Sequence, residues 1–303
     1  MRVLKSFYDK LDELYAAGDQ DAVEAFLLDA ISETGEQNPE RAVLLNELAG
    51  FYRGVSRYAE SENAFERSLS IFEYAGMGET SEYATVLLNL AGLYRMRGDA
   101  DKAVDLFFNA MKRLEDLDAC GSYAYVSILN NLSLAFQSKG ELNQALEYAT
   151  QALELMRTQD ANKHEIATSL NNVSSIYLGL GKLEAADKMI TEALEIYDAM
   201  AEPDVHHAAA LTTNAVLMSR KGHYKDALDG FRRALELTNH FFGENIEFAI
   251  CKRNISEIYE LTGDKLAAVS ELSDALRIFE KILGPDHKSV LSTRKKVDEL
   301  TSA

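Results

Sequence analysis

The sequence predicts an all-α fold in which similar helix pairs stack along the chain. Residues 86–114 contain two amphipathic stretches, each with one apolar stripe at helical spacing, joined by a turn at Gly98-Asp99. Neither helix could bury its stripe alone. The turn residue recurs every 41 or 42 residues, and a fixed period of this size is typical of a stacked repeat array. The equivalent turn positions are Ser56, Gly98, Gly140, Gly181, Gly222 and Gly263.

Residue size also repeats at fixed distances from these turn positions. Small residues allow two helix backbones to approach closely, and a large residue fills the space between neighbouring pairs. The large residues lie four before the turn, at Tyr52, Tyr94, Phe136, Tyr177, Met218 and Tyr259. The small residues lie seven before it (Ala49, Ala91, Ser133, Ser174, Ala215, Ser256), five after it (Ser61, Ala103, Ala145, Ala186, Ala227, Ala268) and twelve after it (Ser68, Ala110, Ala152, Ala193, Ala234, Ala275).

The helix pairs follow one another along the whole sequence. Residues 3–35 form a degenerate first pair around Gly18-Asp19, as expected for a terminal repeat with no neighbour on one face. Turn or cap residues such as Asp160-Ala161-Asn162 and Pro203-Asp204 separate later pairs. Complete pairs are predicted at 39–74, 81–117, 122–158, 163–200, 204–241 and 245–283, followed by a capping helix at 286–301. We therefore expect one repeat domain over residues 1–303.

The order of the repeated positions, L-(small)-x-x-Y-x-x-x-G-x-x-x-x-A-x-x-x-(F/L)-x-x-A, resembles the tetratricopeptide repeat over about residues 40–300. The repeat is longer than the usual ~34 residues. Segments 89–94, 242–245 and 283–287 resemble the subtype found in kinesin light chains and related bacterial proteins. The resemblance implies a right-handed superhelix, or α-solenoid, of about seven helix pairs whose first helices line a concave groove. It also implies a platform for protein partners, without identifying them.

The charge balance argues against two classes of partner. The chain has 31 Lys and Arg against 49 Asp and Glu, a formal net charge of -18, and no basic stripe. We therefore expect it to bind neither nucleic acid nor an anionic membrane surface. No run approaches the ~18 apolar residues of a membrane span, and the first residues lack a secretory signal. Cytoplasmic localisation is expected, with Cys120 and Cys251 as free thiols.

No motif in the sequence predicts catalysis. A Gly-rich phosphate loop, a nucleophile elbow and a catalytic-metal pattern are all missing from it. The six histidines do not combine with carboxylates at metal-binding spacing. We therefore expect no catalytic residue, no metal ion, no cofactor and no enzymatic activity.

Polar residues recur in register on the predicted first helices. Asparagine is a mediocre helix former, so its recurrence suggests another role. The candidate binding residues are Glu47, Asn89, Asn131, Asn172 and Asn254 nine residues before the turn, Asn130, Asn171 and Arg253 ten before it, and Arg53, Arg95 and Gln137 three before it. An amide offers donors and an acceptor, so such a row could hold the backbone of an extended peptide. Alternatively, each asparagine bonds the neighbouring repeat and holds the stack together.

Members of the family that grip a C-terminal carboxylate place Lys or Arg thirteen residues before the turn. The equivalent positions in this chain are neutral: Val43, Thr85, Ser127, Thr168, Ala209 and Ile250. This difference argues against such a clamp and favours an internal or mostly apolar peptide segment.

These observations predict a non-enzymatic scaffold or adaptor that holds a protein or peptide partner in its groove. One alternative is a regulatory protein that senses a signalling peptide. Another is a structural scaffold that assembles with its own copies through the end repeats. We expect a monomer or a weak homo-oligomer.

Overall fold

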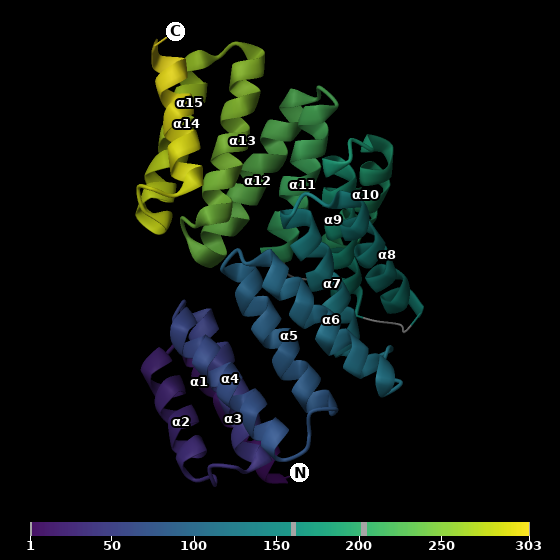
Figure 1. Cartoon of the computed structure of the whole chain (residues 1–303). Helices are drawn as coiled ribbons and strands as arrows, with labels where there is room; N and C mark the ends of the chain where they lie inside the picture. The colour runs from purple at the N-terminus through teal and green to yellow at the C-terminus, as the bar shows by residue number, and fades with distance from the viewer. Residues whose placement is uncertain (1, 159–161, 201–204, 303) are drawn as a thin grey trace. The chain divides into compact units, whose positions relative to one another are not determined.

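The computed structural model describes residues 2–158, 162–200 and 205–302, and the regular structure of these ranges is entirely helical (Figure 1). The expected connector residues 160–161 and 203–204 lie outside the described residues. None of the described helices combines the length and apolar character needed to cross a membrane. The helices are α1 (Arg2–Ala17), α2 (Gln20–Ser32), α3 (Pro39–Gly54), α4 (Tyr58–Tyr74), α5 (Ser81–Met96), α6 (Ala100–Asp116), α7 (Tyr123–Ser138), α8 (Leu142–Thr158), α9 (Lys163–Gly179), α10 (Leu183–Asp198), α11 (Val205–Arg220), α12 (Tyr224–Phe242), α13 (Ile246–Thr262), α14 (Lys265–Leu283) and α15 (Lys288–Ser302).

The chain forms two compact units, Met1–Leu155 and Met156–Ala303. In the first unit α3 packs on α4 and α5 on α6, and the first helices α3, α5 and α7 contact one another in sequence. In the second unit the pairs are α9 with α10, α11 with α12 and α13 with α14, and the first helices α9, α11 and α13 again make contacts. The predicted all-α helical repeat fold is confirmed. The single domain over residues 1–303 stays a prediction.

The turn within each helix pair has one repeated backbone geometry. Gly98 has a φ of +85°, in the left-handed region where glycine has no Cβ to clash, and Ser56 occupies the equivalent place with a φ of 62°. The N–H that follows the turn position donates to the carbonyl of the large residue four before it, at 2.8–2.9 Å in six turns. The turn therefore holds the backbone of that large residue in place.

The predicted small residues lie where the two helices of a pair cross. All the residues seven before, five after and twelve after the six turn positions have an exposed fraction of 0%. Nine residues after the turn, five of the six repeats carry a large buried apolar residue, as Phe65, Phe107 and Phe231 do with at most 1% exposure, and the remaining repeat has Ala149. Close backbone approach is thus combined with a large apolar residue one turn away on the second helix.

Four of the five serines at the crossing positions hydrogen-bond to another helix, and the fifth, Ser133, bonds a carbonyl of its own helix. The Oγ of Ser174 donates to the carbonyl of Ala186 at 2.9 Å, from the first helix to the second. The Oγ of Ser61 donates in the opposite direction, to the carbonyl of Ala49 at 2.8 Å. A buried hydroxyl is tolerated on either helix because the facing backbone carbonyl accepts its proton.

Replacement of Ser256 should separate the hydrogen bond from the packing at this crossing. Its Oγ donates to the carbonyl of Ala268 at 2.8 Å. We expect Ser256→Ala to lower the free energy of unfolding by about 1 kcal/mol through loss of that bond. Ser256→Leu loses the same bond and should cost roughly 1–3 kcal/mol more than Ser256→Ala, because the helices cannot separate without disturbing the core. Urea denaturation followed by circular dichroism measures both, with exposed Ser270→Ala as control. Equal tolerance of alanine and leucine would contradict the close crossing.

Candidate functional site

The predicted binding residues lie on the first helices of their pairs. All are partly buried except Arg253, which is exposed. They are Glu47 and Arg53 on α3, Asn89 and Arg95 on α5, Asn130, Asn131 and Gln137 on α7, Asn171 and Asn172 on α9, and Arg253 and Asn254 on α13. The structure therefore distributes them over two rows, one within each compact unit.

In the first unit these residues bond from one repeat to the next. The Nδ2 of Asn89 donates to the Oδ1 of Asn46 at 3.0 Å, and the Nε of Arg95 donates to the Oδ1 of Asn131 at 3.2 Å. The Nδ2 of Asn131 in turn donates to the carbonyl of Ser127, one turn back on its own helix, at 2.9 Å. Part of the amide row thus stabilises the stack, as the structural interpretation of the asparagines expects.

In the second unit the amides are less engaged. Within residues 162–200 and 205–302, the side chains of Asn172 and Asn254 form no hydrogen bond. Asn171 has a buried Oδ1 that has no partner in the described part of the chain. Because an amide without an internal partner keeps its donors and acceptor, this row is the one better suited to a ligand.

Glu47 has a different environment from the asparagines in its register. Burial raises the pKa of Glu47 above its ordinary value, although the nearby side chains of Tyr8 and Asn46 favour the charged form. Partial burial, together with the nearby carboxylate of Glu47, raises the pKa of Tyr8. Glu47 is therefore tied to the first helix pair and is less available to a partner than the amides.

A pocket of about 570 Å³ lies between α11, α12 and α13. Its lining comprises Ala208, Ala209, Thr212, Thr213, Thr238, Asn245, Glu247 and Ile250, of which only Glu247 is charged. Ala209 and Ile250 are two of the neutral residues thirteen before the turn, and Thr213 stands nine before it. These repeat positions thus meet in one largely apolar recess.

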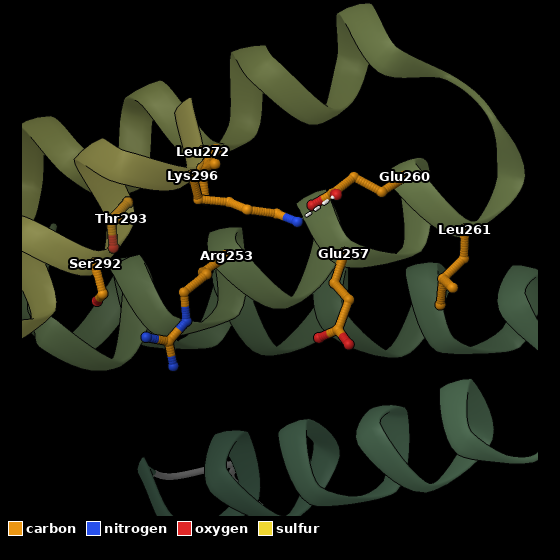
Figure 2. A pocket seen from close by; sticks show the side chains of 8 residues that line it. All are labelled: Arg253, Glu257, Glu260, Leu261, Leu272, Ser292, Thr293 and Lys296. Carbon is orange, nitrogen blue, oxygen red and sulfur yellow. Dashed lines mark ion pairs between the residues drawn. The ribbon is translucent and has the colours of Figure 1, made fainter. Parts of the chain in front are cut away.

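A second pocket, of about 540 Å³, lies where the capping helix α15 meets α13 and α14 (Figure 2). Arg253, Glu257 and Glu260 contribute to it from α13, and Figure 2 shows the first two directed to the same side. The Nζ of Lys296 pairs with a carboxylate oxygen of Glu260 at 2.8 Å. The other lining residues are Leu261, Leu272, Ser292 and Thr293.

The binding residues predicted from the sequence do not include the α15 and α12 side chains of these pockets. Ser292, Thr293 and Lys296 belong to a helix outside the repeat register, so no period marks them. Thr238 of α12 is also buried. It lies sixteen residues after its turn position, where the other repeats have the large residues Phe72, Leu114, Met156, Tyr197 and Phe279. The repeat register did single out Ile250 and Ala209, but only as neutral residues at positions where other members of the family carry Lys or Arg.

The pH dependence of stability should report the burial of Glu47. Because its pKa is raised in the folded protein, the stability that the neutral acid contributes is present below the unfolded pKa and is lost as pH rises through the folded pKa. We expect Glu47→Gln to gain free energy of unfolding relative to wild type from about pH 4.5 upward, then to reach a constant difference. Urea titrations between pH 4 and 7 measure it, with exposed Glu66→Gln as the charge control. A pH-independent difference would show that Glu47 is solvated.

Three of the solved structures that resemble this chain show what its fold is similar to. BtubC (BKLC) from P. vanneervenii is 21% identical, with a TM-score of 0.60 over 67% of this chain and 84% of that one. A P. anserina protein described as a kinesin light chain with nearly identical TPR-like repeats is 16% identical, with a TM-score of 0.54 over 66% and 97%. A Rap protein complexed with Competence and Sporulation Factor is 13% identical, with a TM-score of 0.61 over 99% of both chains. At these identities the likeness concerns the fold alone.

Sequence comparison gives the family. No curated protein matches the chain significantly by sequence. The family model described as tetratricopeptide repeat matches residues 40–116 and 125–199, which together span 152 of the 303 residues. The match includes the predicted turn positions Ser56, Gly98, Gly140 and Gly181, and it confirms the resemblance inferred from them. The chain belongs to the tetratricopeptide repeat family.

Proposed function

We propose that this chain is a non-enzymatic scaffold or adaptor that holds a peptide segment of a partner protein against its first helices. Stacked repeats of this kind present extended surfaces formed from equivalent positions, and such surfaces suit extended ligands. The proposal takes the partner to be a protein and the site of action to be the cytoplasm.

The observation that carries the proposal is the largely apolar pocket between α11, α12 and α13. Its volume of about 570 Å³ lies in the range of ligand sites. The Oγ1 of Thr212 donates to the carbonyl of Ala208 at 3.0 Å, and the Oγ1 of Thr213 to that of Ala209 at 3.1 Å. With these hydroxyl protons already committed, the pocket suits an apolar side chain of the peptide.

The amides of Asn172 and Asn254 support the same proposal, because they could bond the backbone of the peptide. Asn254 lies on α13, which also contributes Ile250 to the pocket, and Asn172 lies on α9. In our proposal these amides bond the peptide's N–H and C=O groups, while the pocket selects its side chain. Affinity and selectivity would then come from different residues.

A second candidate function is a regulatory protein that senses a peptide signal. The Rap protein that shares this fold over almost the whole length of both chains was solved with Competence and Sporulation Factor. A comparable ligand would use the same first-helix surface of this chain. A self-assembling scaffold is the outcome that concentration-dependent size in solution would favour.

Selection from a displayed library of randomised 12-residue peptides tests peptide binding. We expect the full chain to enrich peptides with a common apolar residue. Ala209→Phe, which fills the pocket from an exposed position, should weaken binding of an enriched peptide at least tenfold in fluorescence anisotropy. Asn172→Ala/Asn254→Ala should weaken it about tenfold through lost backbone bonds.

The matched control is Ala59→Phe, at an exposed alanine of the second helix α4. It should leave binding unchanged. Failure to enrich any peptide would reject the proposed function, and equal losses in Ala59→Phe and Ala209→Phe would remove the pocket from it.

A further inference from the structure

Arg53 and Arg95 form an arginine pair on neighbouring first helices of the first unit. Both stand three residues before their turn positions, on α3 and α5, and both are partly buried. The Nη1 of Arg53 donates to the carbonyl of Asn89 at 3.0 Å. The same Nη1 lies only 2.9 Å from the place that a Cβ on Gly92 would occupy. The absence of a side chain at Gly92 therefore provides the space for the Arg53 guanidinium against α5.

The arginine pair keeps most of its hydrogen-bonding capacity. Each guanidinium has five N–H donors. Arg53 uses Nη1 on a backbone carbonyl, and Arg95 uses Nε on the Oδ1 of Asn131. Among residues 2–158, no carboxylate lies within ion-pair distance of either guanidinium. The remaining donors have no acceptor within the described chain.

Two other arginines of the same repeats, each next to a turn position, are paired with acidic residues. Arg57, the residue after the turn position Ser56, bonds the carboxylate of Glu24 at 2.6 Å, and Arg97 pairs with Glu62. The chain has 49 acidic residues, yet none is placed beside the arginine pair in the described part. The arginine pair thus places two guanidiniums without a carboxylate partner on neighbouring first helices of an acidic protein.

The electrostatics of the arginine pair, like its unused donors, favour the binding of an anion. Burial lowers the pKa of Arg53, and burial together with the positive charge of Arg53 lowers the pKa of Arg95. The two cations therefore repel one another in partly desolvated positions. An anion between them would relieve that repulsion and accept the unused N–H donors.

We propose that the arginine pair binds the carboxylate of an acidic side chain in the partner's peptide segment. This proposal rests on the proposed function and adds an acidic residue to the ligand. A planar carboxylate matches the forked donors of guanidinium groups. A single carboxylate also suits a molecule of net charge -18, which would repel a polyanion such as nucleic acid.

A titration of the arginine side chains tests the anion site without any peptide. The probes are sodium acetate and sodium phosphate, each against sodium chloride at constant ionic strength. We expect the Nε–H resonances of Arg53 and Arg95, assigned through single substitutions, to shift saturably with acetate, while exposed Arg67 follows chloride. Shifts no larger than those of Arg67 would overturn the proposal. A response to phosphate alone would assign the pair to a phosphoryl group and reject the carboxylate.

The peptide library then tests the acidic side chain itself. Peptides enriched by the wild type should share an Asp or Glu, and replacing that Glu by Gln should weaken binding at least tenfold. The same replacement should change little in Arg53→Gln/Arg95→Gln. Arg67→Gln/Lys112→Gln, two exposed sites of the same unit, makes the same change in net charge and should keep the preference. Arg95→Lys tests the forked geometry at constant charge.

The two experiments separate the possible failures. Enriched peptides without an acidic residue would reject the arginine-pair proposal and leave the proposed function intact. No enriched peptide would reject the proposed function, while the acetate titration would still decide whether the arginine pair binds a carboxylate. Unchanged melting temperatures of the variants show that losses of binding are not losses of fold.

Discussion

The close crossing of two helices within each pair is the constraint on which this structure depends. Residues seven before and five after the six turn positions from Ser56 to Gly263 are fully buried and are only Ala or Ser. Their size brings the backbones close enough for a serine on one helix to bond a carbonyl of the other. The large apolar residues nine after the turn are then enclosed, and the stripe that neither helix could cover alone is removed from water.

Much of the fold could be predicted because its causes are local. A glycine in the left-handed region marks each turn but one, and Ser56 was recognisable only because the period places it in the series. Small residues in register predict the crossing without any knowledge of distant contacts. The repeat supplies several copies of each signal, so a single departure such as Ser56 or Ser61 does not hide the pattern.

The candidate site was less predictable because its bonds join residues about one repeat apart. Asn131 and Asn172 share a register, but only Asn131 accepts a hydrogen bond from an arginine of the preceding first helix. The space that the Arg53 guanidinium occupies depends on Gly92, 39 residues away, which looks like an ordinary helical glycine in the sequence. The α15 residues of the C-terminal pocket have no register at all. A row of equivalent residues thus predicts a shared face, whereas the neighbours decide which members remain available.

The N–H after each turn position bonds the carbonyl of the large residue four before that position. This bond limits where residues can be inserted or lost in such a chain. This bond and the helix crossing together fix every spacing from the first helix into the second, so an insertion there would rotate one helix face away from the other. The difference between 41- and 42-residue periods must therefore be taken up in the segment between one crossing and the next. The number of residues is therefore fixed across the turn within a pair, whereas it can vary in the connector between successive pairs.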